Sequence, residues 1–184
     1  NFINIKSDYI SFKATYDLGN HVITGGIDLE DTSVYNLFIA RYNGEVRFSS
    51  IADFEAGTYN YVRFHVPQTG ISDVDSVAAM FDIEKTAIFL QDKIYLGDVV
   101  LSVGVRYDDV KTPDKPMLNP KFLATYGYPN NEAFDYDAIQ PRFGFNWDAT
   151  ETLFGDRDRI ASATLRGGYG LFAGRIPNVW YSNA

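Results

Sequence analysis

The stretch YLGDVVLSVGVRYDD, from Tyr95 to Asp109, decides the fold class of this chain. After its Gly97-Asp98 pair, every second residue is apolar: Val99, Leu101, Val103, Val105 and Tyr107. The places between them are held by Val100, Ser102, Gly104, Arg106 and Asp108. Alternation with a period of two is typical of a β-strand with one apolar and one polar face. The stretch predicts such a strand and raises the question of which medium each face contacts.

The composition narrows the classes of protein to consider. A chain of 184 residues can bury a sizeable core, and its net charge of -8 argues against a nucleic-acid surface. It has no cysteine, which excludes disulfides and thiolate chemistry. Aromatic residues make up 16%, as in β-rich proteins and at membrane interfaces. No segment approaches the roughly 20 apolar residues of a transmembrane helix, whereas a membrane β-strand needs only about 10 alternating ones.

The same alternation predicts three hairpins. Gly19-Asn20 and Gly97-Asp98 form the tight turns of the first two, and residues 149–159 connect the third. The expected strands are residues 10–18, 23–29, 84–96, 99–109, 139–148 and 161–171.

The long connections, residues 31–83 and 109–138, lie at the opposite end from the turns. In the first, Asn43-Gly44 predicts a type I′ hairpin turn. Ser50 predicts the N-cap of a short helix, with Asp53 at the third helical position and Gly57 as C-cap. The second is expected to be irregular because of its prolines, Pro113, Pro116, Pro120 and Pro129.

Two interpretations fit the alternation. In a soluble β-sandwich the apolar face is the core, whereas in an outer-membrane barrel it meets lipid and the polar face lines the lumen. The segregation of short and long connections to opposite ends favours the barrel. Aromatic residues on the apolar face favour it too, since they suit membrane girdles. The expected girdle residues are Tyr107, Trp147 and Tyr169.

Charged residues separated by glycines on the other face suit a curved wall around a polar interior. The residues expected to face the lumen or a plug are Thr24, Asp28, Glu30, Gln91, Arg106, Arg142, Asn146 and Arg166. The alternative is that the arginines form a charge ladder with neighbouring acids and only complete the wall.

The sequence gives little support for a metal site or a cofactor site. His21 and His65 have no partner at a ligand spacing, so no metal site is expected. Asp73 and Asp75 suit a divalent ion only as loop oxygens, and a solvated acidic loop explains them better.

The pattern G-x-G-x-x-A from Gly168 to Ala173 lies within an alternating strand and precedes Pro177. A dinucleotide site needs a strand before the glycines and a helix after them, so no cofactor is expected. No nucleophile motif occurs, and an enzymatic role has no support.

Four segments together resemble a known family: HVITGGIDLE, FLQDKIYLGDVVLSVGVRYDD, AIQPRFGFNWD and TLRGGYGLFAGRIPNVWYSNA. From about Asp8 to Ala184 the chain resembles the barrel of TonB-dependent outer-membrane receptors. It is most similar to the Oar-like group, which often carries a carboxypeptidase-regulatory-like domain, and VRFSSIADFEAG is similar to that group too. The resemblance implies an all-β, antiparallel transmembrane barrel of about 22 strands around a plug. Residues 1–184 are then an internal barrel segment of about six strands, without plug, signal peptide or C-terminal strand.

The resemblance implies a receptor in the outer membrane of a Gram-negative bacterium that binds a ligand with its loops and transports it. Its partners would be outer-membrane lipid, an unknown ligand, and TonB through a plug absent from this chain. The loop residues expected to form a ligand surface are Tyr59, Tyr61, Phe64, Tyr126, Tyr128 and Tyr136. The alternative for these rings is packing of the loops on one another. An adhesion or surface-assembly role on the same barrel, and a soluble β-sandwich binding module, are the other functions that stay open.

Overall fold

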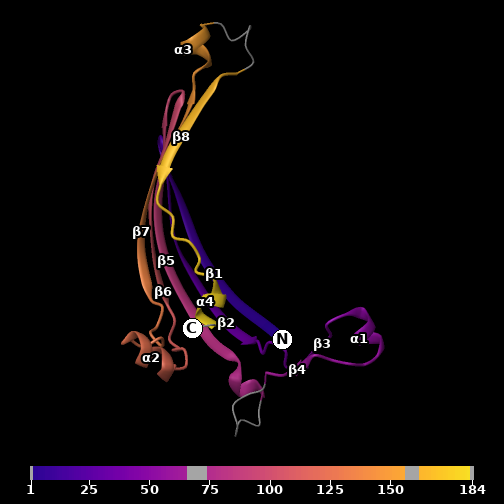
Figure 1. Cartoon of the computed structure of the whole chain (residues 1–184). Helices are drawn as coiled ribbons and strands as arrows, with labels where there is room; N and C mark the ends of the chain where they lie inside the picture. The colour runs from indigo at the N-terminus through magenta and orange to yellow at the C-terminus, as the bar shows by residue number, and fades with distance from the viewer. Residues whose placement is uncertain (1, 66–73, 156–161, 183–184) are drawn as a thin grey trace.

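The computed structural model describes residues 2–65, 74–155 and 162–182. Six antiparallel strands form one curved sheet in the order β1-β2-β5-β6-β7-β8 (Figure 1). A second sheet contains only β3 and β4. The strands are β1 (Phe2–Leu18), β2 (His21–Leu37), β3 (Glu45–Arg47), β4 (Tyr61–Arg63), β5 (Ala79–Leu96), β6 (Val99–Lys111), β7 (Tyr136–Asp148) and β8 (Thr164–Gly170). The predicted all-β antiparallel fold is confirmed, as an open sheet of strands that each pair with their neighbours.

The two tight turns lie where the sequence predicts them. Gly19 and Gly97 have φ values of 63° and 61°, a left-handed conformation that glycine adopts without a steric penalty. Five strands extend further than expected toward the other end of the sheet, so β1 begins at Phe2 and β2 runs to Leu37. These extensions mix apolar and polar residues on both faces, so they lack the regular apolar alternation from which the strands were predicted. The last strand, β8, is shorter than the predicted 161–171 because only residues 164–170 pair with β7.

The hairpin predicted at Asn43-Gly44 is wrong. Residues 38–40 form no strand, and β3 instead pairs with β4 across the intervening helix α1 (Ile51–Glu55). The helix itself is confirmed, since Ser50 Oγ accepts a hydrogen bond from the Asp53 backbone N–H at 3.1 Å. Ala56 is the C-cap, and Gly57 follows it with a φ of 68°.

Short helices occupy connections that were expected to be irregular. In the second long connection, α2 (Pro120–Tyr126) begins after Asn119, whose side chain accepts from two backbone N–H groups, and ends at Gly127 with a φ of 78°. A proline in the first helical turn is compatible with this start, because its missing N–H would have no helical partner there. The remaining helical segments are η1 (Val74–Val77), α3 (Thr150–Phe154) and α4 (Asn178–Ser182).

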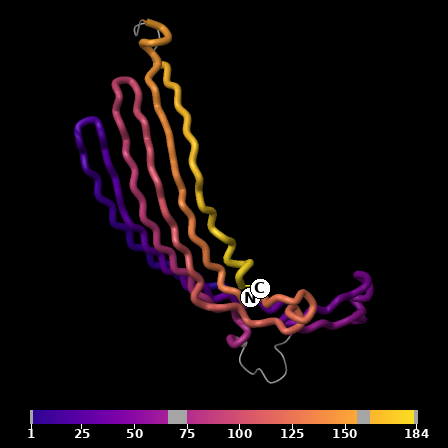
Figure 2. Tube along the Cα trace, turned by 90° about the vertical axis from the view of Figure 1, so that its left-hand side faces the viewer, coloured from indigo at the N-terminus to yellow at the C-terminus, as the bar shows by residue number. Residues whose placement is uncertain are grey.

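The sheet bends along its length into a wall, and the turns rise stepwise from the first hairpin to the third (Figures 1 and 2). After β8 the chain folds back over the concave side, where α4 lies (Figure 1). The buried strand residues, which include Thr24, Ala87, Asp108 and Gln140, all lie on the polar face. The apolar face is exposed, and no second sheet covers it in the described ranges, so a β-sandwich is not what these residues form. No described helix is long and apolar enough to cross a membrane.

Candidate functional site

The apolar face forms a continuous band over β1, β2, β5, β6, β7 and β8. Along β6 it runs from Val99 to Tyr107, about nine residues, which is the length that a tilted strand needs to cross a hydrocarbon core. Its members include large exposed side chains such as Phe12 (67% exposed), Leu90 (55%) and Ile139 (65%). So much contiguous apolar surface is unusual for a water-facing sheet and is what lipid contact requires.

Acidic side chains mark where this band ends toward the long connections. On the same face, an acid stands just beyond the apolar run of each of five strands: Asp8, Asp31, Glu84, Asp109 and Asp137. Asp31 is in register with Asp8 on one side and Glu84 on the other. The apolar band therefore ends at an acidic row on the same face of the sheet. Sequence reasoning missed this row, although the period-two pattern contains it.

The three expected girdle residues all lie on the apolar face. Trp147 is in register with Val99, next to the turn between β5 and β6. Tyr107 is in register with Ile139, near the acidic boundary. Tyr169 is in register with Phe143, between those two levels, and is 72% exposed.

One polar pair interrupts the apolar band. His21 Nδ1 lies 2.6 Å from Asp92 Oδ2, and the two side chains are 37% and 27% exposed. Asp92 is in register with Ile23 and Val103, so apolar side chains flank it across both neighbouring strands. His21, which follows the first turn, therefore gives the Asp92 carboxylate a polar partner that its apolar neighbours cannot supply.

The polar face carries an ion-pair network at mid-height. Arg106 Nη1 lies 2.5 Å from Asp28, and its Nε donates to Asp108 at 2.7 Å. Lys85 Nζ lies 3.2 Å from the same Asp108, and Ser11 Oγ donates to Asp28 at 2.7 Å. The network joins four strands, and Asp108 is 2% exposed. Arg106 and Asp28 therefore form the charge ladder that was the structural alternative for the wall arginines.

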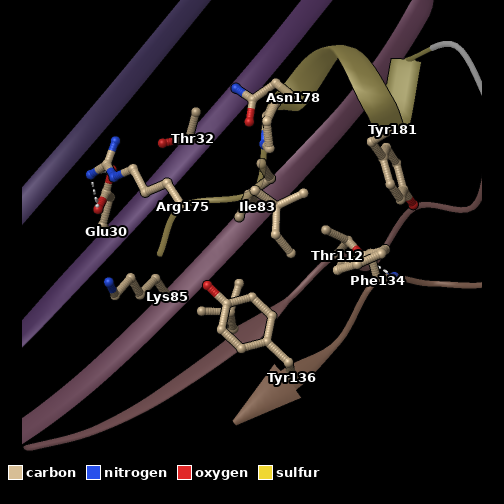
Figure 3. A pocket seen from close by; sticks show the side chains of 13 residues that line it. Glu30, Thr32, Ile83, Lys85, Thr112, Phe134, Tyr136, Arg175, Asn178 and Tyr181 are labelled. Carbon is tan, nitrogen blue, oxygen red and sulfur yellow. Dashed lines mark hydrogen bonds and ion pairs between the residues drawn. The ribbon is translucent and has the colours of Figure 1, made fainter. Parts of the chain in front are cut away.

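The chain after β8 crosses this face as a strap, residues 171–182, and encloses a small cavity. Arg175 Nη2 lies 2.7 and 2.8 Å from the two carboxylate oxygens of Glu30, as the dashed line in Figure 3 marks. Tyr136 donates from its hydroxyl to the Gly174 carbonyl at 3.2 Å, and the ring of Tyr181 packs on Phe81 with centroids 4.5 Å apart. The cavity of about 90 Å³ between strap and wall holds little more than a few water molecules.

On the polar face, between the ion-pair network and the short turns, lie three cations without an ion-pair partner among the described residues. Arg142 stacks over the Phe172 ring at 4.5 Å, and Arg166 lies exposed opposite Asn146. Lys93 shares this face, and none of these three cations has a carboxylate partner within the described ranges. Of the other predicted lumen residues, Gln91 is exposed there, and Thr24 is buried with its hydroxyl 3.2 Å from that of Thr15.

The predicted loop aromatics do not form one surface. In and after α2, the Tyr126 and Tyr128 rings pack on Phe122 with centroids 4.7 and 5.4 Å apart, as the packing alternative expects. Tyr59, Tyr61 and Phe64 belong to a separate arm, residues 38–65, which contains β3, α1 and β4 and projects from the long-connection end (Figures 1 and 2). Placing Tyr136 in a loop is wrong, because it is the first residue of β7 and lines the cavity.

The acidic and glycine motifs that were weighed for metal or cofactor binding have other contacts in the described ranges. No group of three or more acids or histidines there is arranged to hold a metal ion. Asp75 accepts a hydrogen bond from the Tyr35 hydroxyl at 2.7 Å, and Asp73 lies outside the described residues. Gly168 lies in β8, where an added Cβ would stand 2.7 Å from the Phe143 carbonyl oxygen. That glycine therefore serves close strand pairing.

Comparison with known families gives one match. Residues 2–184 match the family described as TonB dependent receptor-like, beta-barrel. No curated protein and no solved structure matches the chain.

Proposed function

Because the chain belongs to the TonB-dependent receptor-like β-barrel family, we propose that it forms part of the wall of an outer-membrane receptor that imports or exports a ligand. Within the family we assign it to the Oar-like group, on the four segments quoted above. The family is one of outer-membrane receptors and transporters of Gram-negative bacteria, and it is not enzymatic.

The observation that carries the proposal is the inverted distribution of polarity across the sheet. Half of the buried strand residues on the concave face are polar or charged, while many large apolar side chains are exposed on the other face. A protein that folds in water buries its apolar face, whereas a barrel in lipid exposes it. The proposed orientation follows: lipid on the Val103 side of β6 and the lumen on the Arg106 side.

The lumen-facing cations fall into two groups that we assign to different roles. The paired network around Arg106 stiffens the wall at mid-height, while Arg142, Arg166 and Lys93 have no carboxylate partner among the described residues. We assign to those cations the contact with a plug that TonB pulls. Removing an unpaired cation at such a contact weakens docking without unfolding the wall.

A second function, surface adhesion, is supported by the arm that projects from the long-connection end (Figures 1 and 2). Deleting residues 38–65 should abolish cell-surface contact and leave transport intact if adhesion is the role.

The test of the main proposal is ligand uptake in the native organism. Wild-type cells should accumulate ligand only while TonB functions, and a deletion of the gene should abolish this. Arg142→Glu with Arg166→Glu should impair uptake at unchanged surface abundance. Uptake that persists at the wild-type rate without TonB would refute the proposal.

A further inference from the structure

The β3–β4 arm, residues 38–65, extends away from the curved wall (Figures 1 and 2). Its sheet has only two strands, so among the described residues each strand leaves one edge without a strand partner. A two-stranded sheet is marginally stable alone, and an open edge is a template for a further strand. The arm thus has main-chain hydrogen-bonding groups available to a partner.

The two faces of the arm differ in chemistry. On one face Val46 is in register with Val62, and they are 51% and 40% exposed. Phe64, which is 61% exposed, lies two residues after Val62 and therefore on the same face. On the other face, Arg47 is in register with Tyr61, and Glu45 with Arg63. A strand added at the β4 edge would therefore meet an apolar row on one face and a cationic row on the other.

The cationic row is fixed by stacking. The guanidinium carbons of Arg63 and Arg47 lie 5.1 and 5.9 Å from the centre of the Tyr61 ring, and Arg47 Nη1 donates to the Tyr61 hydroxyl at 3.3 Å. A stacked guanidinium keeps its N–H edge available for a carboxylate.

Glu45 is in register with Arg63 and lies within reach of its charge, but its ion pair is with another arginine. It is ion-paired with Arg41, whose hydrogen bond holds the pKa of the Glu45 carboxyl below its ordinary value. Within the described ranges, neither Arg47 nor Arg63 has a carboxylate in an ion pair. The two stacked arginines therefore have no ion-pair partner among the described residues and can meet a carboxylate of another polypeptide.

We propose that the β4 edge of the arm binds an extended, acidic segment of a partner polypeptide by strand addition. Alternation in the segment places an acidic residue opposite Arg63 and an apolar residue opposite Val62. A second acidic residue, two positions further along the bound segment, lies opposite Tyr61 and is attracted by the charge of Arg47. An open strand edge favours a polypeptide over an acidic glycan, because only a peptide backbone supplies both donors and acceptors at strand spacing. The inference rests on the proposed function in one respect, that the arm faces the outside of the cell.

The test uses the complete receptor in detergent and a fluorescent octapeptide of alternating aspartate and valine, with binding followed by anisotropy. We expect saturable binding that Arg63→Glu weakens by about tenfold or more, or roughly 1.4 kcal/mol. The matched control Lys121→Glu makes the same charge change on α2 and should leave affinity within about twofold, since it lies on another element. Arg63→Lys keeps the charge and should retain part of the affinity.

Three further ligands separate the causes of binding. An alternating lysine-valine peptide and an aspartate-valine peptide N-methylated at alternate residues should both fail to bind. Equal binding of the N-methylated peptide would overturn strand addition. Arg63-dependent binding of polygalacturonate without peptide binding would overturn the polypeptide and favour an acidic glycan. Absence of peptide binding in a receptor whose uptake still depends on TonB would overturn this inference alone and leave the transport proposal standing.

Discussion

A charge placed at Leu90 tests whether the apolar face of the sheet contacts lipid. Leu90 is 55% exposed and in register with Gly25 and Val105, so no acidic group lies directly across from it. An arginine on the lipid face of a barrel costs about 2–4 kcal/mol at the membrane midplane and less toward the interface. In β6 the band runs from Val99 to Tyr107, which places Val105 and Leu90 beyond its middle. We therefore expect Leu90→Arg to cost about 2 kcal/mol, the lower part of that range.

The matched control is Gln91→Arg, one residue along β5 on the polar face, where the side chain is exposed. The assay is urea unfolding of the complete barrel in lipid vesicles, with the folded fraction read from the electrophoretic mobility of unheated samples. Leu90→Arg should lower the folded-to-unfolded ratio roughly thirtyfold, and Gln91→Arg should change it little. Equal stability of the two variants would refute lipid contact, because a water-facing Leu90 tolerates arginine as well as Gln91 does.

Three more substitutions probe the wall. His21→Leu should destabilise the barrel by roughly 2–3 kcal/mol because it leaves the Asp92 carboxylate unpaired among apolar groups, and adding Asp92→Leu should restore the stability in a double-mutant cycle. Arg106→Met should cost about 2–4 kcal/mol in the same unfolding assay because Asp28 loses its ion-pair partner and Asp108 keeps only Lys85. Arg166→Met should cost under about 0.5 kcal/mol, and equal effects would contradict the network. Gly26→Ala should cost roughly 1–3 kcal/mol, since an added Cβ would stand 2.5 Å from a carbonyl oxygen of β1, and an unchanged urea midpoint would contradict that close approach.

The open edges of the sheet make a prediction about the native protein. In the described residues β1 and β8 each pair on one side only. Unpaired strand edges are not tolerated in lipid, so a lipid-embedded wall requires both edges to pair with further strands. The intact mass of the protein extracted from the outer membrane should therefore exceed 20.7 kDa several-fold. A native outer-membrane product of 20.7 kDa would contradict the expected internal segment.

The strands and tight turns of the wall were predictable from local chemistry. The period-two pattern in β6 and the glycine turns at Gly19 and Gly97 depend on residues close in sequence, and the structure confirms them. The capping of α1 by Ser50 is equally local. The wrong Asn43-Gly44 hairpin has the opposite cause: its turn chemistry is favourable, but β3 finds its partner beyond α1, which no local pattern encodes.

The candidate site was predictable as a set of residues but not as an arrangement. Strand parity assigned Arg106, Arg142 and Arg166 to one face, because successive side chains point to opposite sides. Parity could not show that Arg106 is held by carboxylates from two strands while Arg166 has none among the described residues. The strap that brings Arg175 to Glu30 was also unforeseen, because these residues are 145 positions apart.

The sequence by itself determined the strands, their two faces and the end at which the turns lie, since each depends on a period of two or on the conformational freedom of glycine. Only the tertiary structure decided which charges are paired, which end of the polar face stays cationic, and that the chain after β8 folds back over the wall. Those properties depend on register between strands and on contacts across the sheet. One residue of slippage would exchange the faces of a strand, so pairing fixes what the linear pattern leaves free.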